Sequence, residues 1–248
     1  MKITIRSEYE FLRNFIERIP VDFSKKGESI YKARNELKLF SIEGVDLIVK
    51  SFKKPHFINK IMYSFFRSSK AERSYENALK IEEKGFNTPA PVAYIELYKK
   101  GMISGSYYVS LNCTFSRSFR EFDLRPGTFN KKTDILLAFA DFTAEIHEAG
   151  IYHQDYSNGN ILFRKTNENI EFSLIDINRM FFGQVTEKMG GLAFSRLCAG
   201  EEMLKIIAQR YAEKRKFDIN RFCRKVKYYN DKTMKPTPLD EWPPLENN

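Results

Sequence analysis

Two kinds of hydrophobic pattern divide the chain. Between residues 30 and 52, the stretches "LKLFSI" and "VDLIVKSF" are rich in β-branched and aromatic residues, and Glu43-Gly44 between them is a hairpin turn signal. "TPAPVAYIEL" and "GSYYVSL" predict two further strands, and the prolines of the first exclude a helix there. The pattern predicts an antiparallel sheet in the first half of the chain.

Helical patterns follow. The apolar residues of "SKAERSYENALKIEEKGF" are spaced for one helix that ends at Gly85. "KTDILLAFADFTAEIHEAGI" has a helical period that ends at Gly150, and "AGEEMLKIIAQRYAEKRK" and "INRFCRKVKYY" predict two more helices. The sequence therefore predicts an α+β protein with a strand-rich part over residues 1–112 and a helix-rich part over 113–248.

Size, composition and charge favour a folded, basic protein. The 248 residues are 42% hydrophobic and 15% aromatic, enough to build a core in one large domain or two lobes. Forty-one Lys and Arg against 32 Asp and Glu give a net charge of +9, which favours an anionic partner such as a nucleotide, a phosphorylated sugar, nucleic acid or an acidic membrane surface.

Targeting and cysteine signals point to the cytoplasm. Three cysteines without a CxxC pair argue against a disulfide framework or a structural zinc site, and they fit a reducing compartment. The sequence shows neither the apolar core of a signal peptide nor a run of about 18 apolar residues. We therefore expect a cytoplasmic protein without a membrane span.

The densest group of candidate chemical residues is "IYHQDYSNGNILF", residues 151–163. It holds the pattern H-x-D-x-x-x-x-N, and the apolar run "FSLID" that follows ends in Asp176. Phosphoryl transfer needs a carboxylate that orients the acceptor hydroxyl and oxygen ligands that fix Mg²⁺ on the nucleotide phosphates. We assign Asp155 the first role and Asn160 and Asp176 the second, because a hard cation prefers oxygen ligands.

The first half of the chain offers residues for the nucleotide. Lys50 ends the apolar run "DLIVK", where a kinase-type fold places the lysine that pairs the α and β phosphates, and Glu76 in the next helix could bind that lysine. No G-x-G-x-x-G precedes Lys50. The loop between the first two strands is "KARNEL", with Arg34 and Asn35 at its tip, so phosphate contact there would use side chains or backbone N–H groups.

Three stretches carry a resemblance to a known family. "GIYHQDYSNGNILF", "FSLIDINRM" and "SKAERSYENALKIEEKGFNTPAPVA" resemble the lipopolysaccharide kinases that phosphorylate Kdo or heptose of the inner core, a bacterial branch of the protein-kinase-like superfamily. The resemblance covers roughly residues 28–182. It implies a bilobal protein-kinase-like fold with an antiparallel sheet in the N-lobe and a mainly helical C-lobe.

The resemblance also implies a reaction. ATP and Mg²⁺ would be the cofactors, and a lipopolysaccharide core or another anionic sugar would be the acceptor. In the family's terms, Asp155 is the catalytic aspartate, Asn160 and Asp176 are the metal ligands, and Lys50 with Glu76 is the nucleotide pair. We expect no nucleic acid partner for such an enzyme.

The chain departs from protein kinases at two points, and other classes stay open. Asp176-Ile177-Asn178 replaces D-F-G and no A-P-E follows, which disfavours a regulated protein kinase with a peptide platform. A small kinase for a protein or another small molecule would use the same residues. A pseudokinase that binds an anionic lipid or nucleic acid is favoured by the missing glycine-rich loop and disfavoured by the complete set of ionic residues.

Structural interpretations stand beside the functional ones. We interpret His153 as a residue that orients the loop by hydrogen bonding, because the chemistry already has its carboxylate, and we predict no zinc site. The basic and aromatic stretch from Lys53 to Lys70 fits an ordinary helix on the small lobe. It equally fits an interfacial segment that would hold the enzyme peripherally on the cytoplasmic face of the inner membrane.

Overall fold

The computed structural model describes residues 1–33, 35–52, 68–115, 117–122, 133–166, 169–197 and 199–233. The chain forms two compact units and crosses from the first to the second after Arg117. Two later segments, Leu162–Arg164 and Glu171–Met180, return to the first unit. The first unit therefore combines the N-terminal half with pieces of the second half.

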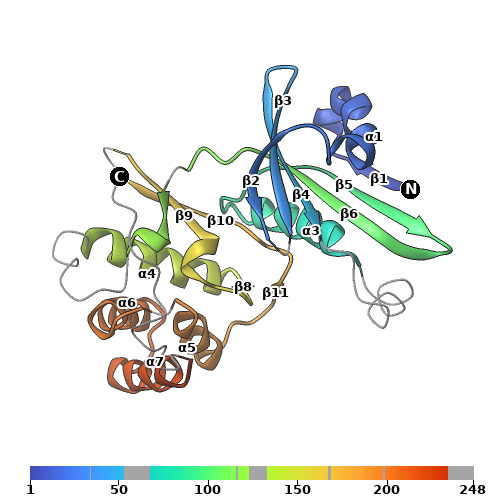
Figure 1. Ribbon diagram of the computed structural model, residues 1–248. Coiled ribbons are helices and arrows are strands. Elements are labelled where there is room, and N and C mark those ends of the chain that lie inside the picture. Colours follow the sequence, from blue (N-terminus) through green and yellow to red (C-terminus); the bar gives the residue numbers. More distant parts are fainter. Residues whose placement is uncertain are drawn as a thin grey trace, which may run out of the picture. The chain divides into compact units, whose positions relative to one another are not determined.

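An antiparallel six-stranded sheet forms the centre of the first unit, in the order β1-β5-β6-β4-β3-β2 (Figure 1). Glu43 and Gly44 join β3 to β4 with φ of 52° and 78°, the type I′ geometry that matches the right-handed twist of a hairpin. The four strands and the turn predicted from the sequence are confirmed. The strands are β1 (Lys2–Ile5), β2 (Glu28–Lys32), β3 (Glu36–Ile42), β4 (Val45–Phe52), β5 (Pro91–Lys99) and β6 (Met102–Leu111).

The two faces of this sheet pack against different helices. The 3₁₀ helix η1 (Ser7–Leu12) and helix α1 (Arg13–Asp22) contribute Leu12 and Ile16 to a core with Leu47 and Val49 of β4. Helix α3 (Lys70–Glu83) packs Ala71 and Tyr75 against Phe52, Tyr94 and Tyr108 on the other face. Because side chains alternate along a strand, Lys50 points away from the α1 core.

Helix α3 matches the predicted helix. The side chain of Ser69 caps its start by accepting a hydrogen bond from the backbone nitrogen of Glu72, and Gly85 follows its end with φ of 80°.

Two small sheets carry the second-half motifs. One has the order β10-β9-β7, with β7 (Arg117–Ser118), β9 (Ile161–Lys165) and β10 (Ile170–Leu174); the other pairs β8 (Ile151–His153) with β11 (Met180–Phe182). The end of β10 is attached to the first unit, because Ser173 forms a parallel bridge with Asn87 and Thr88 Oγ1 donates to the carbonyl oxygen of Leu174 over 2.8 Å. These contacts fix the chain just before Asp176.

Helices make up most of the second unit. The short 3₁₀ helices are η2 (Phe119–Glu121) and η3 (Asn158–Asn160), and the α-helices are α4 (Thr133–Glu148), α5 (Glu187–Ser195), α6 (Glu201–Lys214) and α7 (Ile219–Thr233). Aromatic residues fill the core: Phe194 and Phe222 lie edge-on and stacked, respectively, to Tyr211. The predictions of α4, α6 and α7 are confirmed, whereas α5, which contains two adjacent glycines, was not predicted.

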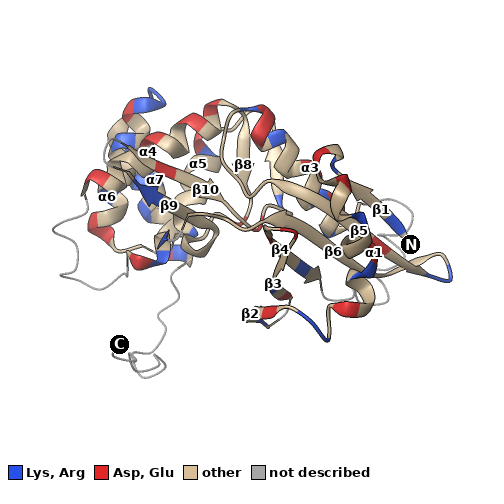
Figure 2. Cartoon of the chain, turned by 90° about the horizontal axis from the view of Figure 1, so that it is seen from above, with Lys and Arg blue, Asp and Glu red and all other residues tan. Residues whose placement is uncertain are grey.

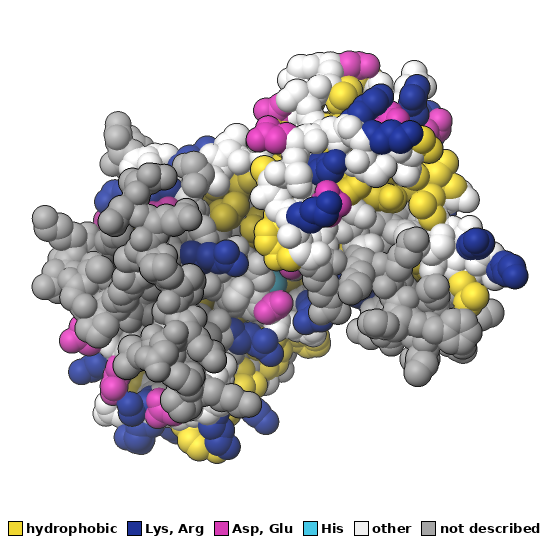
Figure 3. Space-filling view, in the orientation of Figure 1, with side chains coloured by type: hydrophobic (Ala, Val, Ile, Leu, Met, Phe, Trp, Pro, Cys, Tyr) yellow, Lys and Arg dark blue, Asp and Glu magenta, His cyan; other side chains and the backbone are white. Residues whose placement is uncertain are grey.

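Charged residues of both signs lie along the helices (Figure 2). On the face shown in Figure 3, basic side chains are spread among acidic and hydrophobic ones. No helix among the described residues is long and apolar enough to cross a bilayer. Most of the stretch from Lys53 to Lys70 lies outside the described residues.

Candidate functional site

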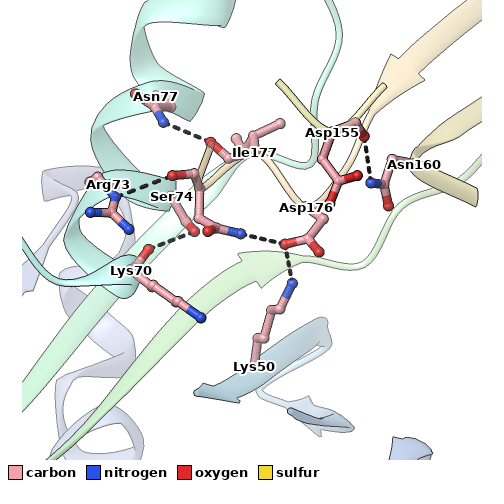
Figure 4. A network of polar contacts seen from close by, with 10 residues as sticks. Lys50, Lys70, Arg73, Ser74, Asn77, Asp155, Asn160, Asp176 and Ile177 are labelled. Carbon is pink, nitrogen blue, oxygen red and sulfur yellow. Dashed lines mark hydrogen bonds and ion pairs between the residues drawn. The ribbon is translucent and has the colours of Figure 1, made fainter. Parts of the chain in front are cut away.

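Lys50 and Asp176, which are far apart in the sequence, meet in the first unit. The Nζ of Lys50 donates to Oδ1 of Asp176 over 2.5 Å, and the side chains are 12% and 34% exposed (Figure 4). The amide nitrogen of Asn178 donates to the same oxygen over 2.6 Å. The structure thus joins the predicted phosphate-binding lysine to the predicted metal-binding carboxylate.

The backbone around Asp176 is held on both sides. Asp176 itself has φ of 55°, a left-handed conformation that few non-glycine residues adopt and that Asp tolerates better than most. The carbonyl oxygens of the next two residues accept hydrogen bonds from helix α3: Asn77 Nδ2 donates to Ile177 over 2.7 Å, and Arg73 Nε donates to Asn178 over 3.2 Å (Figure 4). Helix α3 therefore contacts the Asp176 segment directly.

Glu76 does not take the place expected for it. Its side chain is exposed, and no ion pair joins it to Lys50 among the contacts of the described residues. Another acid on α3, Glu72, is engaged: it accepts hydrogen bonds from Lys2 Nζ over 2.9 Å and from the Tyr94 hydroxyl over 3.1 Å. Burial by itself raises the pKa of Glu72, but the hydrogen bond from Lys2 and the others outweigh it, so its pKa lies below the usual value.

The described residues of the loop between β2 and β3 bond to each other. The backbone nitrogen of Ala33 donates to the carbonyl oxygen of Asn35 over 3.0 Å. Asn35 lies in this loop as predicted from the sequence, and Arg34 lies outside the described residues. Their predicted contact with nucleotide phosphates stays a prediction.

An apolar surface lies beside Lys50 on the same face of the sheet. Leu37 is the cross-strand partner of Lys50, and Leu39 is the partner of Ile48, so the four side chains share one face. The two leucines and Ile48 are half-buried. An apolar surface next to a lysine suits the base and phosphates of a nucleotide. These residues belong to no motif, although the alternation of Ile48 and Lys50 in the sequence indicates that the two side chains share one face of a strand.

The loop from Asp155 to Asn160 belongs to the second unit and is folded on itself. The backbone nitrogen of Asp155 donates to Nδ1 of the buried His153 over 3.0 Å, which supports the structural role predicted for His153. Asn160 Nδ2 donates to the carbonyl oxygen of Asp155 over 2.9 Å (Figure 4). This bond uses the amide nitrogen, so Asn160 keeps its Oδ1, an acceptor, for a cation.

Two arginines flank this loop. Arg196 Nη1 lies 4.0 Å from Oδ1 of Asp155, and both side chains are substantially exposed, at 51% and 41%. The guanidinium of Arg120 covers Gly159 so closely that a Cβ there would come within 2.5 Å of its Nε. Neither arginine belongs to a short motif, so nothing in the sequence marked them. They make the surroundings of Asp155 attractive to an anion.

The donor set fits a hard cation only in part. Among the described residues, no cluster of three or more His, Cys, Asp and Glu side chains could hold a metal ion. Asp176 and Asn160 offer one carboxylate and one amide oxygen. Mg²⁺ is usually bound by one or two carboxylates together with substrate phosphates and water. Each of the two residues therefore offers a donor type that suits Mg²⁺ bound with a nucleotide, and their shared metal site stays a prediction.

Comparisons with known proteins identify the fold and the family. A solved structure described as "WaaP in complex with acyl carrier protein" covers 95% of this chain and 100% of that chain, with a TM-score of 0.66 and 15% sequence identity. This likeness shows the predicted protein-kinase-like fold. A search of curated proteins found no match. The model of the lipopolysaccharide kinase (Kdo/WaaP) family matches residues 49–186, more than half of the chain. The chain is therefore a kinase that belongs to the lipopolysaccharide kinase (Kdo/WaaP) family.

Proposed function

We propose that the protein transfers the γ-phosphoryl group of ATP, with Mg²⁺, to a hydroxyl of Kdo or heptose in the lipopolysaccharide inner core. The observation that carries the proposal is the contact between Lys50 Nζ and Asp176 Oδ1, residues 126 positions apart. A lysine for the phosphates and a carboxylate for the metal are the two charged groups that a kinase-type nucleotide site requires.

Each site residue has a role in this proposal. When ATP binds, Lys50 exchanges its bond to Asp176 for bonds to the α and β phosphates, and the apolar face of Leu37, Leu39 and Ile48 receives the adenine. In the roles that the family resemblance implies, Asp176 and Asn160 would each offer one oxygen ligand to Mg²⁺, which would neutralise charge on the phosphates. Asn35 at the tip of the β2–β3 loop is a further candidate for phosphate contact.

Asp155 orients the acceptor. Its carboxylate is partly exposed and accepts the hydrogen bond of the sugar hydroxyl, so the oxygen of that hydroxyl faces the γ-phosphorus. The backbone of Asp155 is held by His153 and Asn160, which leaves the carboxylate as the part that meets substrate. Arg196 at its side favours an acceptor that carries a negative group, and Kdo is a sugar acid.

We place the enzyme at the cytoplasmic face of the inner membrane, because its acceptor is anchored on lipid A. The net charge of +9 supports contact with an anionic surface. Sedimentation of the protein with vesicles of inner-membrane lipids, at low and high salt, tests this placement.

Phosphate transfer to defined acceptors tests the function. Purified protein is incubated with ATP and Mg²⁺ and with Kdo-lipid A, heptosylated Kdo-lipid A or no acceptor, and the acceptor mass is measured. We expect a gain of one phosphate in one of the two acceptors and none with Asp155→Ala. Nucleotide binding without transfer to either acceptor would instead support a kinase for another molecule or a pseudokinase. Absence of nucleotide binding would contradict the proposal.

A further inference from the structure

We propose that Arg73, Asn77 and Asn178 are positioning residues that hold Asp176 ready for the metal–nucleotide complex, in place of an ion pair between Lys50 and an acid on helix α3. This inference rests on the proposed function, because it concerns the same Asp176. It assigns to helix α3 a polar role at the site that does not depend on Glu76.

The first support is the direction of the α3 side chains. Arg73 and Asn77 are four residues apart, so they lie on one face of the helix, one turn after the other. They donate to the carbonyl oxygens of consecutive residues, Asn178 and Ile177, directly after Asp176 (Figure 4). Glu76 lies on a neighbouring face and is exposed. The face of α3 that meets the site thus carries donors and no acid.

The second support is the conformation of Asp176. A left-handed φ of 55° costs energy in a non-glycine residue and persists where the surroundings hold it. Here Thr88 holds the carbonyl of Leu174 before Asp176, and Asn77 and Arg73 hold the two carbonyls after it. Loss of a donor from α3 would therefore let the backbone relax and turn the carboxylate away from its orientation.

The third support is the side chain at the third position of the motif. A glycine at position 178, as in D-F-G, has no side chain to offer the carboxylate, whereas the side chain of Asn178 donates to Asp176 Oδ1 over 2.6 Å and is itself buried. When Lys50 turns to the phosphates of ATP, the Asn178 bond stays with Asp176. The carboxylate then keeps its orientation during the step in which it meets the metal.

Helix α3 is also fixed to the sheet by other charges. Glu72 binds Lys2 of β1 and the hydroxyl of Tyr94 on β5. One part of the helix is thus attached to the sheet, and the face with Arg73 and Asn77 is attached to the Asp176 segment. The helix has a defined place without an ion pair to Lys50.

The test compares nucleotide affinity with and without Mg²⁺. The full chain and its variants are titrated with ATP by calorimetry, once with Mg²⁺ and once with EDTA, and the ratio of the two affinities is the readout. The variants are Asn178→Ala and Arg73→Gln. Asp176→Asn serves as the reference for loss of the metal ligand, and Glu83→Gln, an exposed acid on α3, as the matched control.

We expect the wild type and Glu83→Gln to gain affinity with Mg²⁺. In Asn178→Ala and Arg73→Gln this gain should fall by about two- to tenfold, the value of one hydrogen bond, while affinity in EDTA stays the same. Asn77→Ala should show the same fall together with a lower melting temperature, because it leaves a buried carbonyl without its donor. The conclusion therefore depends on Asn178→Ala and Arg73→Gln and not on Asn77→Ala.

The remaining outcomes overturn the inference in distinguishable ways. If the wild type gains nothing from Mg²⁺, the proposed function fails and this inference fails with it. If the wild type gains affinity but Asn178→Ala and Arg73→Gln keep the full gain, only the inference is wrong. Equal losses with Mg²⁺ and EDTA would show that the residues merely maintain the fold. Glu76→Gln is titrated as a further variant. If it alone loses the gain in affinity with Mg²⁺, the inference is wrong and Lys50 pairs with Glu76 when the nucleotide is bound.

Discussion

His147 at the end of α4 makes the protein sensitive to acid. It is buried in the second unit, and its Nδ1 lies 2.8 Å from the Tyr211 hydroxyl. Arg215 Nη1 donates to the same hydroxyl oxygen over 3.0 Å. The other ring nitrogen, Nε2, is buried without a hydrogen-bond partner among the described residues, so a second ring proton would have no acceptor there. The site is built for a neutral imidazole.

The magnitude follows from the pKa. Burial, with a smaller contribution from the charge of Arg215, lowers the pKa of His147 from 6.5 to about 3. Above pH 6.5, the histidine is neutral in both the folded and the unfolded chain, and this contribution to stability is complete. Below pH 6.5 the histidine binds a proton in the unfolded chain but not in the folded chain. The free energy of unfolding therefore falls by about 1.4 kcal/mol for each pH unit until about pH 3. At pH 5 the loss is about 2 kcal/mol.

Urea unfolding at pH 8 and pH 5 measures this loss, with His147→Gln as the comparison. The glutamine oxygen can accept from the Tyr211 hydroxyl but has no proton to bind, so the variant lacks the histidine contribution at both pH values. The free energy of unfolding of the wild type should fall by about 2 kcal/mol more than that of the variant. Equal falls in the two proteins would refute the reasoning, because they would mean that His147 titrates alike in the folded and unfolded chains.

Three further variants test other contacts. Lys50→Met should weaken ATP–Mg²⁺ binding at least about tenfold in calorimetry, because a charge-assisted bond to phosphate is lost, and unchanged affinity would contradict the assigned role. Arg196→Ala should raise the KM of the anionic acceptor in the transfer assay and leave the KM of ATP as it is; a change in the KM of ATP alone would refute this. Gly190→Ala should lower stability by about 1–3 kcal/mol, since its Cβ would come within 2.6 Å of the buried Tyr211 hydroxyl, whereas Gly105→Ala, with 3.6 Å to its nearest neighbour, should melt near the wild type.

The sequence predicted those elements whose own residues specify them. Alternation and β-branched residues defined β3 to β6, and helical periods ending at glycine defined α3 and α4. Edge strand β1 was missed because four residues carry little local signal, and its place is set by pairing with β5, Lys2 opposite Glu96. Helix α5 was missed because its glycines disfavour a helix locally; Gly190 is tolerated since it allows close packing against Tyr211.

The order of the elements along the sequence predicted the two compact units less well than it predicted the elements themselves. A single boundary between residues 112 and 113 could not foresee that segments 162–164 and 171–180 return to the first unit. That return depends on long-range contacts, such as the bridge between Asn87 and Ser173, which no local pattern encodes. The same return brings Asp176 to Lys50.

In the candidate site, too, short motifs predicted some residues, whereas others depend on how a helix packs. Motif order was sufficient to select Lys50 and Asp176, which the structure joins. Motif order did not determine which face of α3 lies against these two residues, because the rotation of a helix about its axis is set by its packing. Ala71, Tyr75 and Ala78 are buried against the rest of the unit, which leaves Glu76 on the solvent side. Arg73 and Asn77 were therefore visible only in three dimensions.

The Lys50–Asp176 pair is better explained by chemistry than by stability. Removing a lysine largely from water, at 12% exposure, carries a desolvation cost that a single carboxylate contact seldom exceeds by much. A well-packed apolar pair would hold the strand and the loop together equally well. Asp176 also adopts a left-handed backbone and takes a second donor from Asn178, both of which add cost or constraint without enlarging the core. Charges kept at such a cost are expected where a charged ligand enters, and the ATP of a kinase is such a ligand.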